Sequence, residues 1–271
     1  TSNLDEFFMI RVGSLYDMVQ TDDRHRDSRS GMTPQEQLDA IYAAVAPLHK
    51  ERDKTYAGIK KELSPYGVCG LDFKELEADE KKYVKKCFKE QILPVLSPQI
   101  VDSSHPFPHL MNKDIYVTAN LKHINSRKNK DDKEKEQILG IVPVPTYVSD
   151  ILMLPGHDIR YIRMEKVIME YLDLVFDQYE VSDPNYICVT RNADVSPDDE
   201  ALEVTDDFRK LMQSTLHKRR RMAVVRLETA EKLTPEMQEY FCKKFKITPE
   251  QIFRTKMPMK LDYMFSIAGN L

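Results

Sequence analysis

The chain opens, after Thr1, with a stretch that combines a helix start with an apolar face: Ser2-Asn3-Leu4-Asp5-Glu6-Phe7-Phe8-Met9-Ile10-Arg11-Val12. Ser2 and Asp5 have the spacing of a capping box, and an acidic residue in the first turn favours a helix N-terminus. An apolar stripe follows at helical spacing, formed by Leu4, Phe7, Phe8 and Ile10. Asn3 has no place in this pattern. Its amide, beside free backbone N–H groups, suits a nucleotide phosphate or base, and an ordinary helix cap is the alternative.

Three further stretches stand out downstream. The first is rich in proline and reads Leu96-Ser-Pro-Gln-Ile-Val-Asp-Ser-Ser-His-Pro-Phe-Pro108. The second is Val189-Thr190-Arg191-Asn192-Ala193-Asp194. The third places the basic run Arg219-Arg220-Arg221 shortly before Ala223-Val224-Val225-Arg226-Leu227-Glu228.

In their order along the chain, residues 2–12 and these three stretches resemble the signature elements of bacterial polyphosphate kinases of the first, phosphohistidine type. The resemblance implies an α+β multidomain fold, in which an N-terminal helical bundle is followed by a mixed α+β head domain. The N-terminal domain, lacking its first helix, is expected at residues 1–105 and the head domain at 106–271. The family's C-terminal, phospholipase D-like catalytic domains are expected to be absent from this sequence.

The resemblance also implies an activity for the intact protein. Such an enzyme transfers the terminal phosphate of ATP reversibly to inorganic polyphosphate, through a phosphohistidine that would lie outside this chain. Asn3 matches the asparagine of the family that contacts ATP, whereas the Mg²⁺ ligands belong mainly to the missing domains. No catalytic or metal residue is therefore assigned here, and the chain alone is predicted to be inactive. A homodimer or tetramer formed through the head domain is implied, and the alternative is a stand-alone dimerisation or polyphosphate-binding module.

Composition limits the other possibilities. The 271 residues are 41% hydrophobic and 31% charged, with a formal net charge of −4, which argues against a nucleic-acid-binding protein. No run approaches the roughly 18 apolar residues of a membrane span, and no signal peptide opens the sequence, so a cytoplasmic location is expected. Four widely spaced cysteines predict free thiols rather than disulfides or a zinc site.

Helix signals dominate residues 1–93. Thr33, Pro34 and Glu36 form a capping box, after which apolar residues follow helical spacing as far as a predicted stop at Gly67. Pro47 is expected to kink this helix or to leave a defect in its hydrogen bonds. Another helix is expected from about Asp79 until Pro94 ends it.

Mixed signals follow the proline-rich stretch. Strands are expected at 115–121, 137–144, 186–190 and 222–228, and helices at 164–175, at 198–217 and after Thr234. Thr248-Pro249-Glu250 repeats the helix-start signal, and the charged residues 122–136 read as a hairpin loop. The irregular spacing favours an α+β domain over a wound parallel sheet.

Two candidate functional features remain. The dense basic cluster His217-Lys218-Arg219-Arg220-Arg221 is explained either by the dipole of a helix C-terminus or by polyphosphate binding. It is also where a membrane contact, at most peripheral, would occur. His105 precedes a proline and has no nucleophile or acid at motif spacing, which favours a hydrogen-bonded packing role over catalysis.

Overall fold

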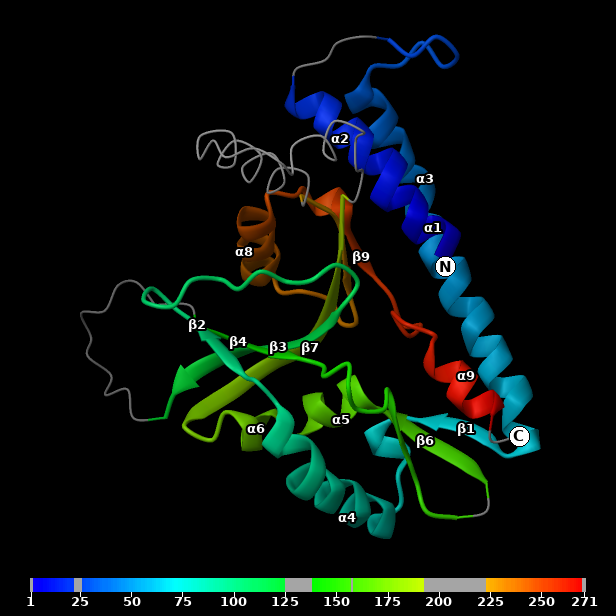
Figure 1. The fold of residues 1–271 in the computed structure, drawn as a ribbon, viewed down its shortest axis with the longest axis vertical. Coiled ribbons are helices and arrows are strands. Elements are labelled where there is room, and N and C mark those ends of the chain that lie inside the picture. The colour runs from blue at the N-terminus through cyan, green and yellow to red at the C-terminus, as the bar shows by residue number, and fades with distance from the viewer. Residues whose placement is uncertain (1, 22–25, 125–137, 157, 193–222, 270–271) are drawn as a thin grey trace, which may run out of the picture. The chain divides into compact units, whose positions relative to one another are not determined.

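A computed structural model describes residues 2–21, 26–124, 138–156, 158–192 and 223–269 (Figure 1). The chain divides into two compact units. The first unit comprises Thr1–Lys50, Val189–Glu228 and Lys232–Arg254. The second unit comprises Glu51–Cys188, Thr229–Glu231 and Thr255–Leu271. The basic cluster 217–221 and the helix expected at 198–217 lie outside the described residues.

The N-terminal stretch is helical, but its buried face differs from the predicted stripe. Helix α1 (Ser2–Phe7) leads through a π-helical turn (Phe8–Val12) into α2 (Gly13–Gln20). Phe8, Val12 and Leu15, which follow i, i+4 and i+7 spacing, are buried. Phe7 and Ile10, predicted to be part of the stripe, are instead 39% and 48% exposed.

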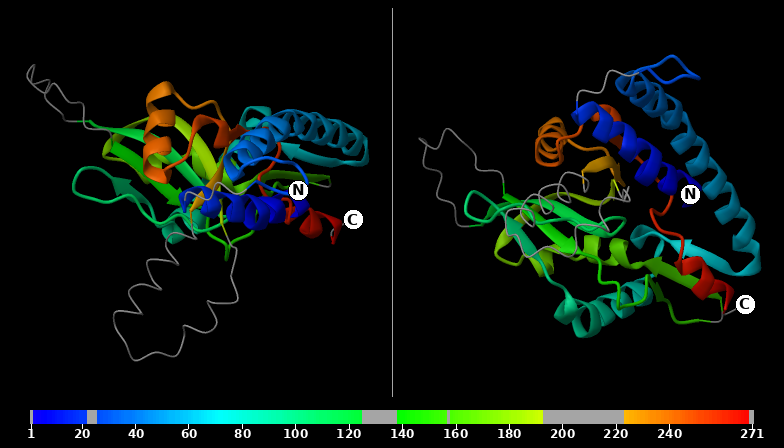
Figure 2. Two further views of the ribbon diagram at one scale, coloured as in Figure 1. Left: turned by 90° about the horizontal axis from the view of Figure 1, so that it is seen from above. Right: turned by 45° about the horizontal axis from the view of Figure 1, so that its top comes forward.

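The capping predictions for the longest helix are confirmed. Helix α3 (Pro34–Leu63) begins where Glu36 N donates to Thr33 Oγ1 and Thr33 N donates to Glu36 Oε2. The helix continues through Pro47, where the backbone has no N–H to donate, so the expected defect in the helical hydrogen bonds is present (Figure 2). One 3₁₀ turn later, Gly67 ends it in the left-handed conformation, with a φ of 77°.

The first unit also contains the end of β7 (Tyr179–Arg191), β8 (Val224–Thr229) and β9 (Ile252–Arg254), which are successive neighbours in a sheet. Helix α8 (Pro235–Phe245) begins as predicted, with Thr234 accepting a hydrogen bond from Met237 N. The second start signal, at Thr248, gives only one 3₁₀ turn because β9 follows directly. The apolar core of this unit joins helical and strand residues: Phe8, Val12, Leu15, Leu38, Tyr42, Val45, Val225 and Phe253.

The second unit contains two sheets. In one, β2 (Gln99–Val101), β4 (Ile138–Pro143), β3 (Ile115–His123) and β7 are neighbours in that order. Strands β3 and β4 pair antiparallel, which confirms the predicted strands on either side of the charged stretch. In the other, β1 (Val68–Leu71) pairs parallel with β6 (Ile159–Arg163), and β5 (Ile151–Met153) pairs antiparallel with β6. Among residues 1–93, where helix signals dominate, strand β1 was not predicted, and it pairs with the distant strand β6.

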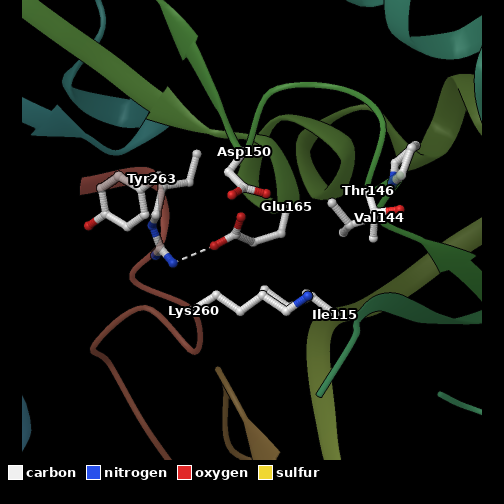
Figure 3. Close-up of a pocket in the computed structure, with 9 residues that line it drawn as sticks. Ile115, Val144, Thr146, Asp150, Glu165, Lys260 and Tyr263 are labelled. Atoms are coloured by element: carbon white, nitrogen blue, oxygen red, sulfur yellow. Dashed lines mark hydrogen bonds and ion pairs between the residues drawn. The ribbon is translucent and has the colours of Figure 1, made fainter. Parts of the chain in front are cut away.

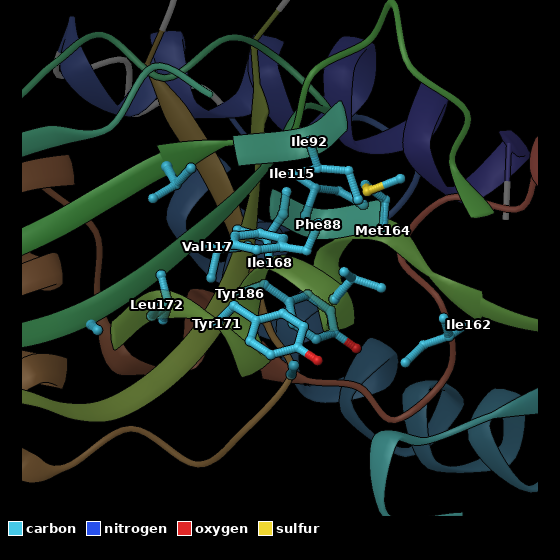
Figure 4. Close-up of a cluster of buried hydrophobic side chains, with 14 of the residues drawn as sticks. Phe88, Ile92, Ile115, Val117, Ile162, Met164, Ile168, Tyr171, Leu172 and Tyr186 are labelled. Atoms are coloured by element: carbon cyan, nitrogen blue, oxygen red, sulfur yellow. The ribbon is translucent and has the colours of Figure 1, made fainter. Parts of the chain in front are cut away.

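Helices pack on these sheets around the core of the second unit. The helices are α4 (Ala78–Cys87) with its π-helical extension (Phe88–Ile92), α5 (Met164–Glu170) and α6 (Leu172–Val175). Figure 4 shows Phe88, Ile168 and Tyr171 packed together, and all three are buried. A smaller cluster joins Val68 and Tyr161 to α9 (Tyr263–Ala268). The fold is therefore α+β, with helices at the N-terminus and mixed sheets after them.

The structure also bears on the predictions for the cysteines, for His105 and for membrane-spanning helices. All four cysteines are free thiols, of which Cys87 and Cys188 are buried. His105 is largely exposed, and its Nδ1 lies 2.9 Å from Asp102 Oδ1, so it is hydrogen-bonded without being packed. None of the described helices has the length and apolar character needed to cross a membrane.

Candidate functional site

A buried arginine organises the polar interior of the first unit. The side chain of Arg226 is fully buried, and it lies on strand β8 between the apolar residues Val225 and Leu227. Its Nε and Nη2 donate to Thr190 Oγ1 at 3.1 and 2.8 Å, and Nη2 also donates to Asp5 Oδ1. Glu228 Oε2 lies 3.4 Å from the same nitrogen. Two carboxylates and a hydroxyl therefore surround Nε and Nη2 of a guanidinium removed from water, whereas Nη1 is buried and has no hydrogen-bond partner among the described residues.

The contact with Asp5 changes the interpretation of the N-terminal helix. Asp5 was expected to cap the helix, but its carboxylate pairs with Arg226, and helix α1 includes Ser2 as its first residue. The guanidinium also lies over the ring of Phe8, with 4.6 Å between Cζ and the ring centroid. Helix α1 and the turn that follows it are thus tied to strand β8 by an ion pair and a cation–π contact.

Asn3 lies on the same helix with an exposed side chain. Residues two apart on a helix point to different faces, so Asn3 is directed away from the side on which Asp5 meets Arg226. The ion pair therefore fixes the helix while Asn3 faces solvent.

A second contact joins one of the stretches singled out in the sequence to helix α2. Asn192 Nδ2 donates to Gly13 O at 3.2 Å and to Asp17 Oδ2 at 2.8 Å. The approach is so close that a Cβ on Gly13 would lie 2.1 Å from Asn192 Oδ1. Only glycine therefore fits at the start of α2 while Asn192 keeps this position.

The polar interior extends to helix α3. The ring of His49 stacks on Phe253 with centroids 4.5 Å apart, and His49 Nδ1 lies 4.0 Å from Glu228 Oε1. Tyr42 Oη donates to Val225 O at 2.7 Å and accepts from Gln251 Nε2 at 3.2 Å. Burial raises the pKa of Tyr42, so its hydroxyl remains a donor throughout the physiological range.

Sequence reasoning missed most of this network. Arg226, Thr190 and Asp5 each lie in a stretch that was singled out, but their contact was not predicted. A charged residue inside the run Val224-Val225-Arg226-Leu227 is the signal that could have identified a buried ion pair. No comparable sequence pattern indicated that His49 or Gln251 would be part of the buried network.

Residues that the structure describes line at least two cavities of the second unit. The smaller is about 20 Å³ and is surrounded by Asp150, Glu165, Lys260 and Tyr263 (Figure 3). That volume holds about one water molecule, so it is not a ligand site. The larger is about 180 Å³ and has several basic side chains in its wall. In the described part of the chain, no group of three or more His, Cys, Asp or Glu residues could hold a metal ion.

Comparison with known proteins identifies the family. Residues 1–70 match the model of the polyphosphate kinase N-terminal domain, and residues 79–267 match that of the polyphosphate kinase middle domain. The chain therefore belongs to the polyphosphate kinase family.

Curated relatives agree over the whole chain. A polyphosphate kinase of Halalkalibacterium halodurans is 32% identical over 275 residues, and one of Bacillus cereus is 31% identical over the same length. Each alignment covers 100% of this chain but only 38% of the relative.

A solved structure agrees in fold. The crystal structure of polyphosphate kinase from Porphyromonas gingivalis aligns with a TM-score of 0.68 and 24% identity, over 94% of this chain and 33% of the other.

Proposed function

We propose that this chain is the N-terminal and head portion of a polyphosphate kinase, with the N-terminal domain at residues 1–105 and the head domain at 106–271. The intact protein would transfer the terminal phosphate of ATP reversibly to inorganic polyphosphate. The observation that carries this proposal is the match to both the N-terminal and the middle domain of the family. The remaining length of the relatives is where the catalytic domains would lie.

The chemistry would occur outside this chain. A histidine of the missing domains would take the phosphoryl group from ATP, release ADP and pass the group to the terminal oxygen of polyphosphate. Mg²⁺, held mainly by the same domains, would balance the negative charge of the phosphates.

Within this chain, Asn3 is the residue proposed to contact ATP. Its amide can donate a hydrogen bond to a phosphate oxygen and can both donate to and accept from a base. The side chain is exposed on a helix that Asp5 and Arg226 hold in place. Arg226 would thus act as a positioning residue, because it binds Asp5 and so holds the helix that carries Asn3.

Other features of the proposal concern assembly and substrate. The head domain would support a homodimer or tetramer in the cytoplasm, and Lys218, Arg219, Arg220 and Arg221 would contribute to polyphosphate binding. The alternative function, a stand-alone dimerisation or polyphosphate-binding module, requires no nucleotide contact at Asn3.

The test measures polyphosphate synthesis by the intact protein at a series of ATP concentrations. Asn3→Ala is expected to raise the KM for ATP about tenfold with a smaller effect on kcat, because a contact made before the chemical step is lost. Gln91→Ala removes another exposed helical amide, from the π-helical extension of α4, and is expected to leave the KM unchanged. An unchanged KM for the Asn3 variant would contradict the assignment.

A further inference from the structure

The cavity of about 180 Å³ in the second unit has no role in the proposed function. Helix α3, strands β1 and β6 and helix α5 contribute to its wall. Its charged residues are the cations Lys60, Arg163, Lys166 and Lys256 and the carboxylates Asp53 and Asp72. Four positive groups therefore face two negative ones.

The two carboxylates already have partners in the protein. Asp53 accepts from the backbone N–H groups of Lys256 and Met257 at 2.9 and 3.0 Å, and from Thr255 Oγ1 at 2.9 Å. Asp72 accepts from Lys166 Nζ. The carboxylate of Asp53 thus binds the segment 255–257, which places Lys256 beside the cavity.

The cations differ in their partners, and Lys166 forms an ion pair with Asp72. Arg163 is held by Glu165 and lies 3.1 Å from Tyr186 Oη, whereas Lys60 reaches Glu75 only at 3.8 Å. Burial, and then repulsion by Lys60, lower the pKa of Lys166 to about 8, although Glu231 opposes this change. Two ammonium groups that repel each other across a cavity are both stabilised by an anion placed between them.

A neutral donor is also present. Burial raises the pKa of Tyr161 to about 12, so its hydroxyl keeps its proton. Gly70 leaves space for that hydroxyl, since a Cβ there would lie 2.7 Å from Tyr161 Oη. Phosphate oxygens accept hydrogen bonds from both ammonium and hydroxyl groups.

We propose that this cavity binds a small phosphate oxyanion, either free orthophosphate or pyrophosphate or the end of a phosphate chain, between Lys60, Lys166 and Lys256. The volume supports a small ligand, because pockets for larger organic molecules begin at about 300 Å³. At about 30 Å³ per water molecule, the anion would replace a handful of waters.

Isothermal titration calorimetry of the 271-residue chain, with orthophosphate and with pyrophosphate at constant ionic strength and pH 7.5, tests this proposal. We expect saturable binding that weakens at least tenfold in Lys166→Met and in Lys60→Met. Lys82→Met removes an exposed lysine on α4 that pairs with Asp79, and it should bind as the unmodified chain does. Absence of saturable binding, or equal affinity in Lys166→Met and Lys82→Met, would overturn the proposal.

A second measurement follows proton uptake on binding. An anion beside Lys166 raises the pKa of its ammonium, so at pH 8 the unmodified chain should take up more protons than Lys166→Met, in which only the ionisation of the anion and of the other groups contributes. Titration in buffers of different ionisation enthalpy measures the uptake by both proteins, and equal uptake at pH 8 would exclude Lys166 as a ligand.

Long-chain polyphosphate separates the two sources of the anion. If the chain end is the ligand, polyphosphate binding should scale with the concentration of ends and weaken in Lys166→Met. If free orthophosphate or pyrophosphate is the ligand, only the small anions should respond to that substitution. Either result supports the site. If Lys166→Met changes the binding of neither polyphosphate nor the small anions, the proposal is contradicted.

Discussion

Arg226 and Asp5, which lie 221 residues apart in the chain, form an ion pair in which the arginine is completely buried. The pair connects the first helical turn to strand β8. Thr190 and Glu228 complete the surroundings of the guanidinium, so three separate stretches of sequence meet at one charge.

Replacement of Arg226 is expected to be costly. Arg226→Met leaves Asp5 and Glu228 without their shared cation, and loss of one partner of a buried ion pair typically lowers the free energy of unfolding by about 3–5 kcal/mol. Urea unfolding followed by circular dichroism measures the change. Asp5→Asn should cost less, because Arg226 retains Glu228 and Thr190. A loss below about 1 kcal/mol for Arg226→Met would show that the pair contributes little.

Gly13→Ala is expected to destabilise the protein although it places alanine in a helix. The backbone of Gly13 has ordinary helical angles, so only the clash with Asn192 opposes a Cβ. Overpacking of this kind typically costs about 1–3 kcal/mol. Gly58→Ala is the matched control, since its Cβ meets nothing within 4 Å and should stabilise α3 by up to about 1 kcal/mol. Thermal unfolding of both variants should show shifts of opposite sign, and shifts of the same sign would contradict the packing argument.

Thr33→Ala is expected to weaken the start of helix α3. The substitution removes the hydroxyl that accepts from Glu36 N, and the loss of such a cap costs about 1 kcal/mol. Amide hydrogen exchange should accelerate in the first turn of α3 while the helix start at Thr234 stays protected. Unchanged exchange at the amides of Glu36 and Gln37, which donate to Thr33, would indicate that the cap is dispensable.

The lowered pKa of Lys166 predicts a pH dependence of stability. Between its folded pKa of about 8 and its ordinary value of 10.5, the unfolded chain binds a proton that the folded chain lacks. The stability of the unmodified chain relative to Lys166→Met should therefore rise from pH 8 to 10 and stay constant below pH 7.5. Urea midpoints for the two proteins across this range test it, and a difference independent of pH would mean that Lys166 keeps an ordinary pKa.

The helices could be predicted from sequence because their signals are local. Thr33 with Glu36, and Thr234 with Pro235, mark helix starts within four residues, and the structure confirms both. Strand β1 has only four residues, and its partner lies far along the chain, with Val68 opposite Ile159. No local pattern reveals such pairing, which is why no strand was expected in this segment.

The candidate site shows the same limit. The stretches that carry the family resemblance were visible in the sequence, but the contact between Asp5 and Arg226 depends on the fold. Within the first helical stretch, Phe8 and Val12 are buried while Phe7 and Ile10 are exposed. Regular i, i+4 spacing is compatible with the pair Phe8 and Val12, but the sequence alone did not decide between this face and the predicted stripe.

The most direct test of the proposed function is ATP formation from ADP, Mg²⁺ and long-chain polyphosphate, compared between this 271-residue chain and the intact protein. We expect turnover by the intact protein and none by the chain alone, because the phosphoryl-transfer site is proposed to lie outside it. Turnover by the chain alone would contradict the account and would place the site among its own residues, with His105 the first to substitute.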